Sequence, residues 1–87
     1  MLSPKRLADI RGGLYLSQEG MARLLGVSFA SVNRWERGHS GPTGTVMEVY
    51  RALDIALKSG KTARQILGND TDPGQILHRI FRNAYGG

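Results

Sequence analysis

Two stretches with helical apolar spacing, 17–25 and 28–37, are separated by a short turn that contains Gly26 and Val27. Each stretch begins with a serine, which can cap a helix by accepting a hydrogen bond from a free backbone N–H. A glycine directly follows each stretch, as is typical of helix ends. A glycine-containing connection this short forces two helices of about eight residues to pack against each other.

Helical spacing continues through the rest of the chain, and no segment alternates apolar and polar residues as a half-buried strand would. Start and stop residues predict further helices at 3–11, 43–58 and 72–85, with Ser3, Thr43 and Asp72 as their caps. Between the last two, Thr62 begins a short helical turn, ARQIL, that ends at Gly68. The sequence therefore predicts an all-α fold of five or six short helices, with a core unit in 1–58 and a helical extension in 59–87.

The chain has 87 residues, a length typical of one domain, and its 12 basic and 7 acidic residues give a net charge of +5. A surplus of this size on a small protein favours polyanionic partners, with nucleic acid ahead of a membrane surface. The chain has no cysteine, which excludes disulfides, thiolate metal sites and thiol catalysis. No apolar run is long enough to span a bilayer, and the N-terminus lacks the apolar segment of an export signal. We therefore expect a cytoplasmic protein.

Residues 16–38, LSQEGMARLLGVSFASVNRWERG, carry the most specific motif of the chain. They resemble the helix-turn-helix of the XRE family, which includes the lambda-repressor-like and Cro-like DNA-binding domains. The matching features are SQE at the start, the central alanine, LGVS at the turn and RWERG at the end, and the helical pattern extends the likeness over 3–57. The resemblance implies a lambda-repressor-like bundle that binds a specific double-stranded DNA sequence and acts as a transcriptional repressor.

In such a pair the second helix lies in the major groove, with its outward side on the base edges. Because Val32 must face the core, we expect Phe29, Ala30, Asn33 and Arg34 to contact bases. Arginine pairs with guanine, asparagine with adenine, and apolar groups contact the thymine methyl group. Two alternatives stay open, namely that Phe29 packs on a neighbouring loop and that Arg34 is a solvated charge.

A second group of residues is expected to contact the DNA backbone, as the matching positions do in the family. Gln18 lies at the start of its helix, where free N–H groups and the helix dipole favour a phosphate. The full expected set is Gln18, Ser28, Ser31, Arg37, His39 and Ser40. Ser28 can also act simply as a helix cap, and Gln18 and His39 as solvated residues. His78 lies too far from His39 to suggest a metal site.

Trp35 and Glu36 are interpreted as structural residues within the same helix. The resemblance implies that Trp35 packs across the end of the helix. Glu36 would repel phosphate if it faced DNA, and the matching family position forms a salt bridge with the residue that corresponds to Arg11. We therefore expect an Arg11–Glu36 salt bridge that is at least partly shielded from water.

Other functions are less well supported by the sequence. An enzyme is not expected, because there is no cysteine, the two histidines are far apart, and no acidic residues suggest a catalytic pair. No cofactor is expected. The main alternative is an antitoxin that binds a toxin protein and also represses its own operon. The segment GPTG at 41–44, followed by an apolar helix, resembles some antitoxin relatives.

The last predicted helix carries an apolar stripe that includes Ile76, Leu77, Ile80 and Phe81. A single helix-turn-helix reads only a few base pairs, so we expect a homodimer on a palindromic operator, with this stripe at the dimer interface. The alternative is that the stripe closes the core of the monomer. Basic residues beside the stripe would also fit a helix that lies on a membrane surface. Packing of the stripe on the core or on a second subunit is the favoured interpretation.

Overall fold

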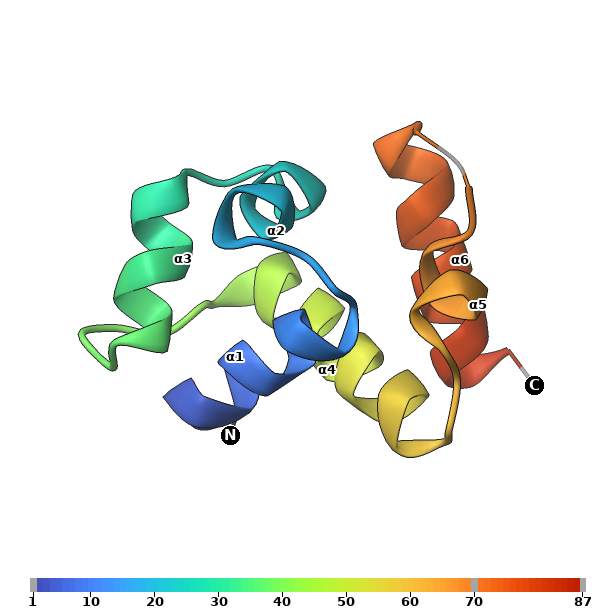
Figure 1. Ribbon diagram of the computed structural model, residues 1–87, viewed down its shortest axis with the longest axis horizontal. Coiled ribbons are helices and arrows are strands. Elements are labelled where there is room, and N and C mark those ends of the chain that lie inside the picture. Colours follow the sequence, from blue (N-terminus) through green and yellow to red (C-terminus); the bar gives the residue numbers. More distant parts are fainter. Residues whose placement is uncertain (1, 70, 87) are drawn as a thin grey trace.

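The computed structural model describes residues 2–69 and 71–86, which form six α-helices and no strand (Figure 1). The helices are α1 (Pro4–Gly13), α2 (Gln18–Leu25), α3 (Phe29–Glu36), α4 (Gly44–Lys58), α5 (Ala63–Leu67) and α6 (Pro73–Tyr85). The all-α fold expected from helical spacing is therefore confirmed. In the part of the chain that the structure describes, no helix has the length and apolar character needed to cross a membrane.

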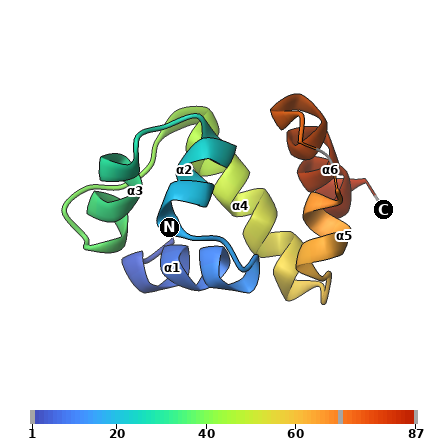
Figure 2. The same cartoon turned by 45° about the horizontal axis from the view of Figure 1, so that its top comes forward.

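Helix α4 is the centre of the fold, and α1, α5 and α6 all contact it. Helices α2 and α3 pack against each other, and α1 also contacts α3. Figures 1 and 2 show α3 at one end of the molecule and α5 with α6 at the other. The molecule measures 34 × 24 × 23 Å along its principal axes. The helix expected to read bases is thus far from the C-terminal helices.

Side-chain hydrogen bonds fix four of the helix starts. The side-chain oxygens of Ser3, Ser17, Ser28 and Thr62 accept a bond at 3.0–3.1 Å from the backbone N–H three residues further on. These caps have φ between −73° and −86° and ψ between 154° and 168°. Thr43 and Asp72 occupy the N-cap positions of α4 and α6 as expected, but the expected side-chain capping bonds are not formed. Thr43 departs from this geometry in φ (−134°) and Asp72 in ψ (117°), and neither side chain accepts a capping bond.

One hydrophobic core spans the chain, from the N-terminal helices to the last one. Its largest fully buried side chains are Leu7, Ile10, Met21, Val32, Tyr50, Leu53, Ile66 and Ile80. Ile66 comes from α5 and Ile80 from α6, so the C-terminal helices share this core. The expectation that Ile80 forms a dimer contact is wrong, because its side chain is 0% exposed within a single chain. Burial of such a side chain contributes about 1.5–3 kcal/mol to stability.

An ion-pair cluster ties α1 to α4. Arg6 Nε donates to Asp54 Oδ1 at 2.6 Å, and Lys58 Nζ lies 3.2 Å from Asp54 Oδ2. Burial acts to raise the pKa of Asp54, but the hydrogen bonds from Arg6 and Lys58 outweigh it, so this pKa lies below its ordinary value. The cluster helps to hold α1 in the position from which it also contacts α3.

Candidate nucleic-acid interface

The turn between α2 and α3 fixes how the two helices pack. Gly26 ends α2 in the left-handed conformation, with φ 72°, and the Val27 N–H donates to the carbonyl of Ala22 at 3.0 Å. Glycine adopts this conformation without the steric cost that a side chain would add. Met21 from α2 and Val32 from α3 are both fully buried. Helix α3 is thereby anchored along one side and exposed along the other.

The exposed side of α3 carries the residues that were expected to contact bases. Phe29 is 49% exposed, Ala30 and Arg34 are also exposed, and Asn33 is half-buried. On the inner side, the half-buried Trp35 packs edge-on against Tyr50 of α4, with the ring centroids 6.2 Å apart. The outer side therefore combines a ring, a methyl group, an amide and a guanidinium on a helix that packing holds in place.

Arg11 and Glu36 form a bidentate ion pair between α1 and α3. Arg11 Nε donates to Glu36 Oε2 at 2.8 Å, and Arg11 Nη2 donates to Oε1 at 2.9 Å. Arg11 Nη1 also donates to the carbonyl of Leu16 at 2.9 Å, and the side chain of Glu36 is only 6% exposed. Burial acts to raise the pKa of Glu36, but hydrogen bonds from Arg11 and Gln18 outweigh it, so this pKa lies below its ordinary value.

Gln18 and Asn33 continue this hydrogen-bond chain toward the exposed side of α3. Gln18 Nε2 donates to Glu36 Oε1 at 3.0 Å, and Asn33 Nδ2 donates to Gln18 Oε1 at 3.2 Å. From the sequence, Gln18 is expected at the DNA backbone and Asn33 at a base. The structure brings the two side chains together, so neither amide is oriented independently of the other.

The carboxylate of Glu36 sets the orientation of both amides. An ionised carboxylate only accepts hydrogen bonds, so Gln18 must present its NH₂ group to Glu36 and its oxygen to Asn33. Asn33 must in turn present its NH₂ group to Gln18. Its oxygen and its second N–H then remain for another partner, and this is the donor and acceptor pair that asparagine uses on adenine.

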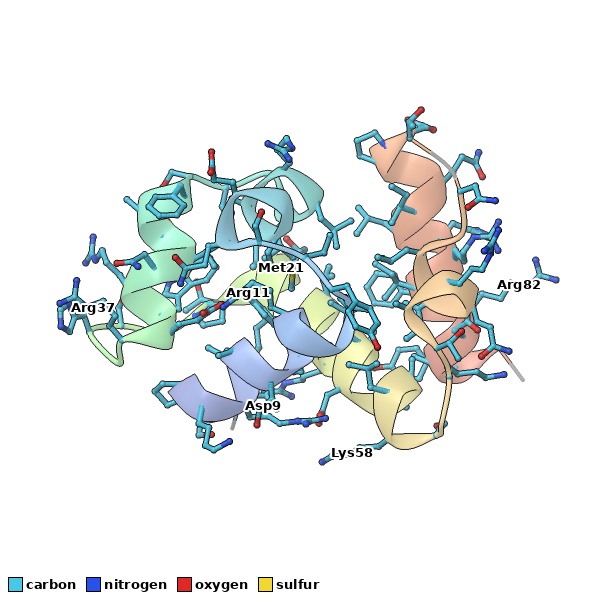
Figure 3. All side chains as sticks on the ribbon, viewed as in Figure 1. Asp9, Arg11, Met21, Arg37, Lys58 and Arg82 are labelled. Carbon is cyan, nitrogen blue, oxygen red and sulfur yellow. The ribbon has the colours of Figure 1, made fainter. Side chains whose placement is uncertain are left out.

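The other residues expected at the DNA backbone lie at both ends of α3. Ser28 Oγ caps the helix and also lies 3.0 Å from Ser31 Oγ, so these two hydroxyls bond to each other. Arg37, His39 and Ser40 are exposed in the segment that follows α3. Figure 3 shows Arg37 at this end of the molecule, pointing away from the body. The six residues thus border the exposed side of α3 without forming one cluster.

The sequence matches the family described as helix-turn-helix over residues 7–50, just over half of the chain. The match covers α2 and α3 completely, together with most of α1 and the first part of α4. The chain belongs to the lambda-repressor-like helix-turn-helix family. No curated protein and no solved structure matches the chain.

The family identifies this helix-turn-helix protein as a DNA-binding transcriptional regulator. The matched segment contains Arg11, Glu36, Gln18 and Asn33, so the whole hydrogen-bond chain lies within the family domain. Helices α5 and α6 lie outside it. The family therefore accounts for the end of the molecule that carries α3 and leaves the other end unassigned.

Sequence reasoning missed one contact inside the helix-turn-helix domain and one beside it. One is the Gln18–Asn33 bond, for which the only signal is two amide residues on consecutive helices. The other is the clamp of Arg6 and Lys58 on Asp54. The i,i+4 spacing of the acid and the lysine on α4 could have indicated half of this clamp. The arginine lies on a different helix, and only the fold brings it there.

Proposed function

We propose that this protein is a sequence-specific double-stranded DNA-binding repressor that places α3 in the major groove. The observation that carries this proposal is the division of α3 into two sides. Val32, Trp35 and Glu36 hold the helix to the domain, and Arg34 and Phe29 are exposed on the other side. A rigid helix with an exposed, chemically mixed side suits the reading of base edges.

Within this proposal each of the four residues on the outer side of α3 has its own contact. Arg34 donates two bonds to guanine, and Asn33 pairs with adenine through the amide groups that Gln18 leaves free. Phe29 and Ala30 contact thymine methyl groups. Two of the four contacts are apolar, so hydrogen bonds specify fewer positions than the length of the helix would allow.

The backbone contacts position the protein without reading the sequence. Gln18 lies at the N-terminus of α2 and Ser28 at that of α3, where free N–H groups favour phosphates. Arg37, His39 and Ser40 contact the backbone beyond the end of α3. Gln18 can take this role while it holds Asn33, because its amide nitrogen carries two hydrogens and Glu36 uses one of them.

We further propose that two copies bind a palindromic operator and thereby repress the adjacent gene. Each base contact is worth only about 1–3 kcal/mol, so one α3 gives little discrimination against a genome. Of the stripe on α6, Ile76, Leu77 and Phe81 are half-buried and remain candidates for the dimer contact. Leu77 and Phe81 line a small hollow of about 230 Å³ together with Val46 and Val49 of α4.

Selection of bound DNA from a random pool tests the proposal. The wild-type protein should recover a palindrome with half-sites one helical turn apart, roughly 34 Å. Arg34→Ala should lose about 1–3 kcal/mol of binding free energy at the recovered site and accept other bases at one position of each half-site. Recovery of the same base preference with Arg34→Ala would show that this residue does not read DNA.

A further inference from the structure

A basic hollow lies between α5 and α6, outside the family domain. Its volume is about 1040 Å³, just above the roughly 300–1,000 Å³ typical of ligand pockets. Its lining includes Lys61, His78, Arg79 and Arg82, with the side-chain amides of Gln65 and Gln75. No acidic residue lines it within residues 2–69 and 71–86.

The charges of Lys61 and Arg82 are not neutralised within the described part of the chain, where neither forms an ion pair. Elsewhere in the same part of the chain, Arg6, Arg11 and Lys58 each pair with a carboxylate. A hollow lined by Lys61 and Arg82 is therefore suited to an anionic ligand.

The hollow is far from the proposed DNA contact. Figure 3 shows Arg82 and Arg37 at opposite ends of the long axis of the molecule, which measures 34 Å. A duplex seated on α3 leaves the hollow open. The ligand of the hollow is therefore a second partner, separate from the operator.

The aromatic side chains of the hollow do not suit single-stranded nucleic acid. Such strands bind by stacking bases on exposed aromatic rings. Tyr85 lines the hollow, but its ring already stacks on Phe81, with the centroids 6.3 Å apart and the planes at 18°. One face of the ring is thus covered, and no other Phe, Tyr or Trp among the described residues lines the hollow.

The amides of the hollow suit a polypeptide backbone. Gln65 Oε1 accepts from the Thr62 N–H at 2.8 Å, which leaves the Gln65 NH₂ group to donate. Asn83 Nδ2 donates to the carbonyls of Gln65 and Arg79, which leaves the Asn83 oxygen to accept. The hollow thus offers a donor for a peptide carbonyl and an acceptor for a peptide N–H, beside cations for carboxylates.

We propose that the hollow between α5 and α6 binds an acidic segment of a partner polypeptide. Aspartate or glutamate side chains of the partner pair with Lys61 and Arg82, and its backbone bonds to Gln65 and Asn83. This site is independent of the proposed DNA contact, and a chain bound to its operator presents it to solvent. The protein then links a DNA site to an acidic protein partner.

Fluorescence anisotropy with a labelled peptide of alternating Glu and Gly tests this site. The wild type should bind this peptide at least about tenfold more tightly than its Gln counterpart. The double variant Lys61→Glu, Arg82→Glu should lose about tenfold in affinity for the Glu peptide. The matched control Arg51→Glu, Arg64→Glu changes the net charge equally at exposed residues outside the lining, and should stay within about twofold of the wild type.

Equal losses in the two double variants would overturn the proposal, because net charge alone would then explain binding. Tighter binding of oligothymidine than of the Glu peptide would also overturn it, in favour of nucleic acid. Circular dichroism checks folding, and if the charge-reversed variant is unfolded, Lys61→Gln, Arg82→Gln is measured in the same way. The double variant in the hollow and the control variant should change DNA binding equally, because both alter the net charge by the same amount away from α3. A failure of the peptide test is therefore distinguishable from a failure of the repressor proposal.

Discussion

Glu36 places a negative charge on the helix that we propose to enter the major groove, where the surrounding phosphates are also negative. The structure resolves this conflict by burial, because the carboxylate is 6% exposed and Arg11 holds both of its oxygens. The side chain thus serves as an internal acceptor. It anchors α3 to α1 and fixes the orientation of the Gln18 amide.

Replacement of Glu36 by glutamine should lower the free energy of unfolding by about 2–3 kcal/mol at neutral pH. This is below the roughly 3–5 kcal/mol expected when a fully buried pair loses one partner, because Arg11 is 22% exposed and partly hydrated. Urea unfolding of the wild type and of Glu36→Gln measures the difference. A loss below about 0.5 kcal/mol would mean that the pair behaves as a surface salt bridge.

The same carboxylate predicts a pH dependence. The pKa of Glu36 is lowered in the folded state, so its stabilisation is fully present above the ordinary pKa of 4.5 and is lost as the pH falls below that value. The wild type should therefore lose more stability than Glu36→Gln between about pH 7 and pH 3. Asp54 shifts in the same direction, so Asp54→Asn should flatten the acid limb further when added to Glu36→Gln. Parallel acid limbs in the wild type and Glu36→Gln would contradict the assignment.

At the scale of helices, the contact between α2 and α3 changes what Gln18 is expected to do. The sequence suggested a phosphate ligand whose loss weakens binding to all DNA sequences alike. The 3.2 Å bond from Asn33 makes Gln18 a positioning residue for a base contact as well. Both effects follow from one amide, because it bonds to Glu36 and Asn33 with only part of its hydrogen-bonding capacity.

Gln18→Ala should therefore weaken DNA binding and also relax the base preference at the position that Asn33 reads. Asn33→Ala should relax the same position, at a cost of about 1–3 kcal/mol. The double variant should lose less than the sum of the two single losses, since the residues act as one unit. Selection from a random pool gives the preference, and a double-mutant cycle gives the coupling. A purely additive cycle with unchanged preference after Gln18→Ala would return Gln18 to the role of backbone contact alone.

The helices themselves were largely predictable, and physical chemistry explains which parts were not. Apolar spacing and the serine caps of α1, α2 and α3 identified these helices because both signals are local in sequence. The side-chain capping bonds of α4 and α6 were not predicted correctly, because such a bond depends on backbone angles that residue type does not fix. For the candidate site, the exposed side of α3 followed from helical periodicity. The Gln18–Asn33 bond depends on the interhelical angle and was not visible.

For the whole molecule, the sequence left open whether the stripe on α6 belongs to the core or to an interface. The structure divides the stripe, because Ile80 is fully buried whereas Leu77 and Phe81 are half-buried beside a hollow of about 230 Å³. A helix can present both sets, since Leu77 and Phe81 are four residues apart and lie on one side, whereas the adjacent residues Ile80 and Phe81 diverge by about 100°. Only the packed fold shows which of these residues the monomer encloses.

This division gives separate predictions for neighbouring residues of α6. Ile80→Asp should unfold the chain, because it places a charge in the core without a partner. Leu77→Asp should leave the chain folded and shift it from dimer to monomer, since this side chain retains access to solvent. Ile55→Asp is the matched control, because Ile55 is 38% exposed on α4 and does not line the hollow. It should remain folded and dimeric.

Sedimentation with circular dichroism on the same samples distinguishes these outcomes. A wild-type mass near twice the 9.5 kDa of the chain, reduced to one chain by Leu77→Asp alone, would support an interface along α6. An unfolded Leu77→Asp would assign the whole stripe to the core of the monomer. A folded wild type that sediments as a monomer would mean that pairing requires the operator. The two-fold symmetry of the selected DNA site would then have to come from contacts made only on DNA.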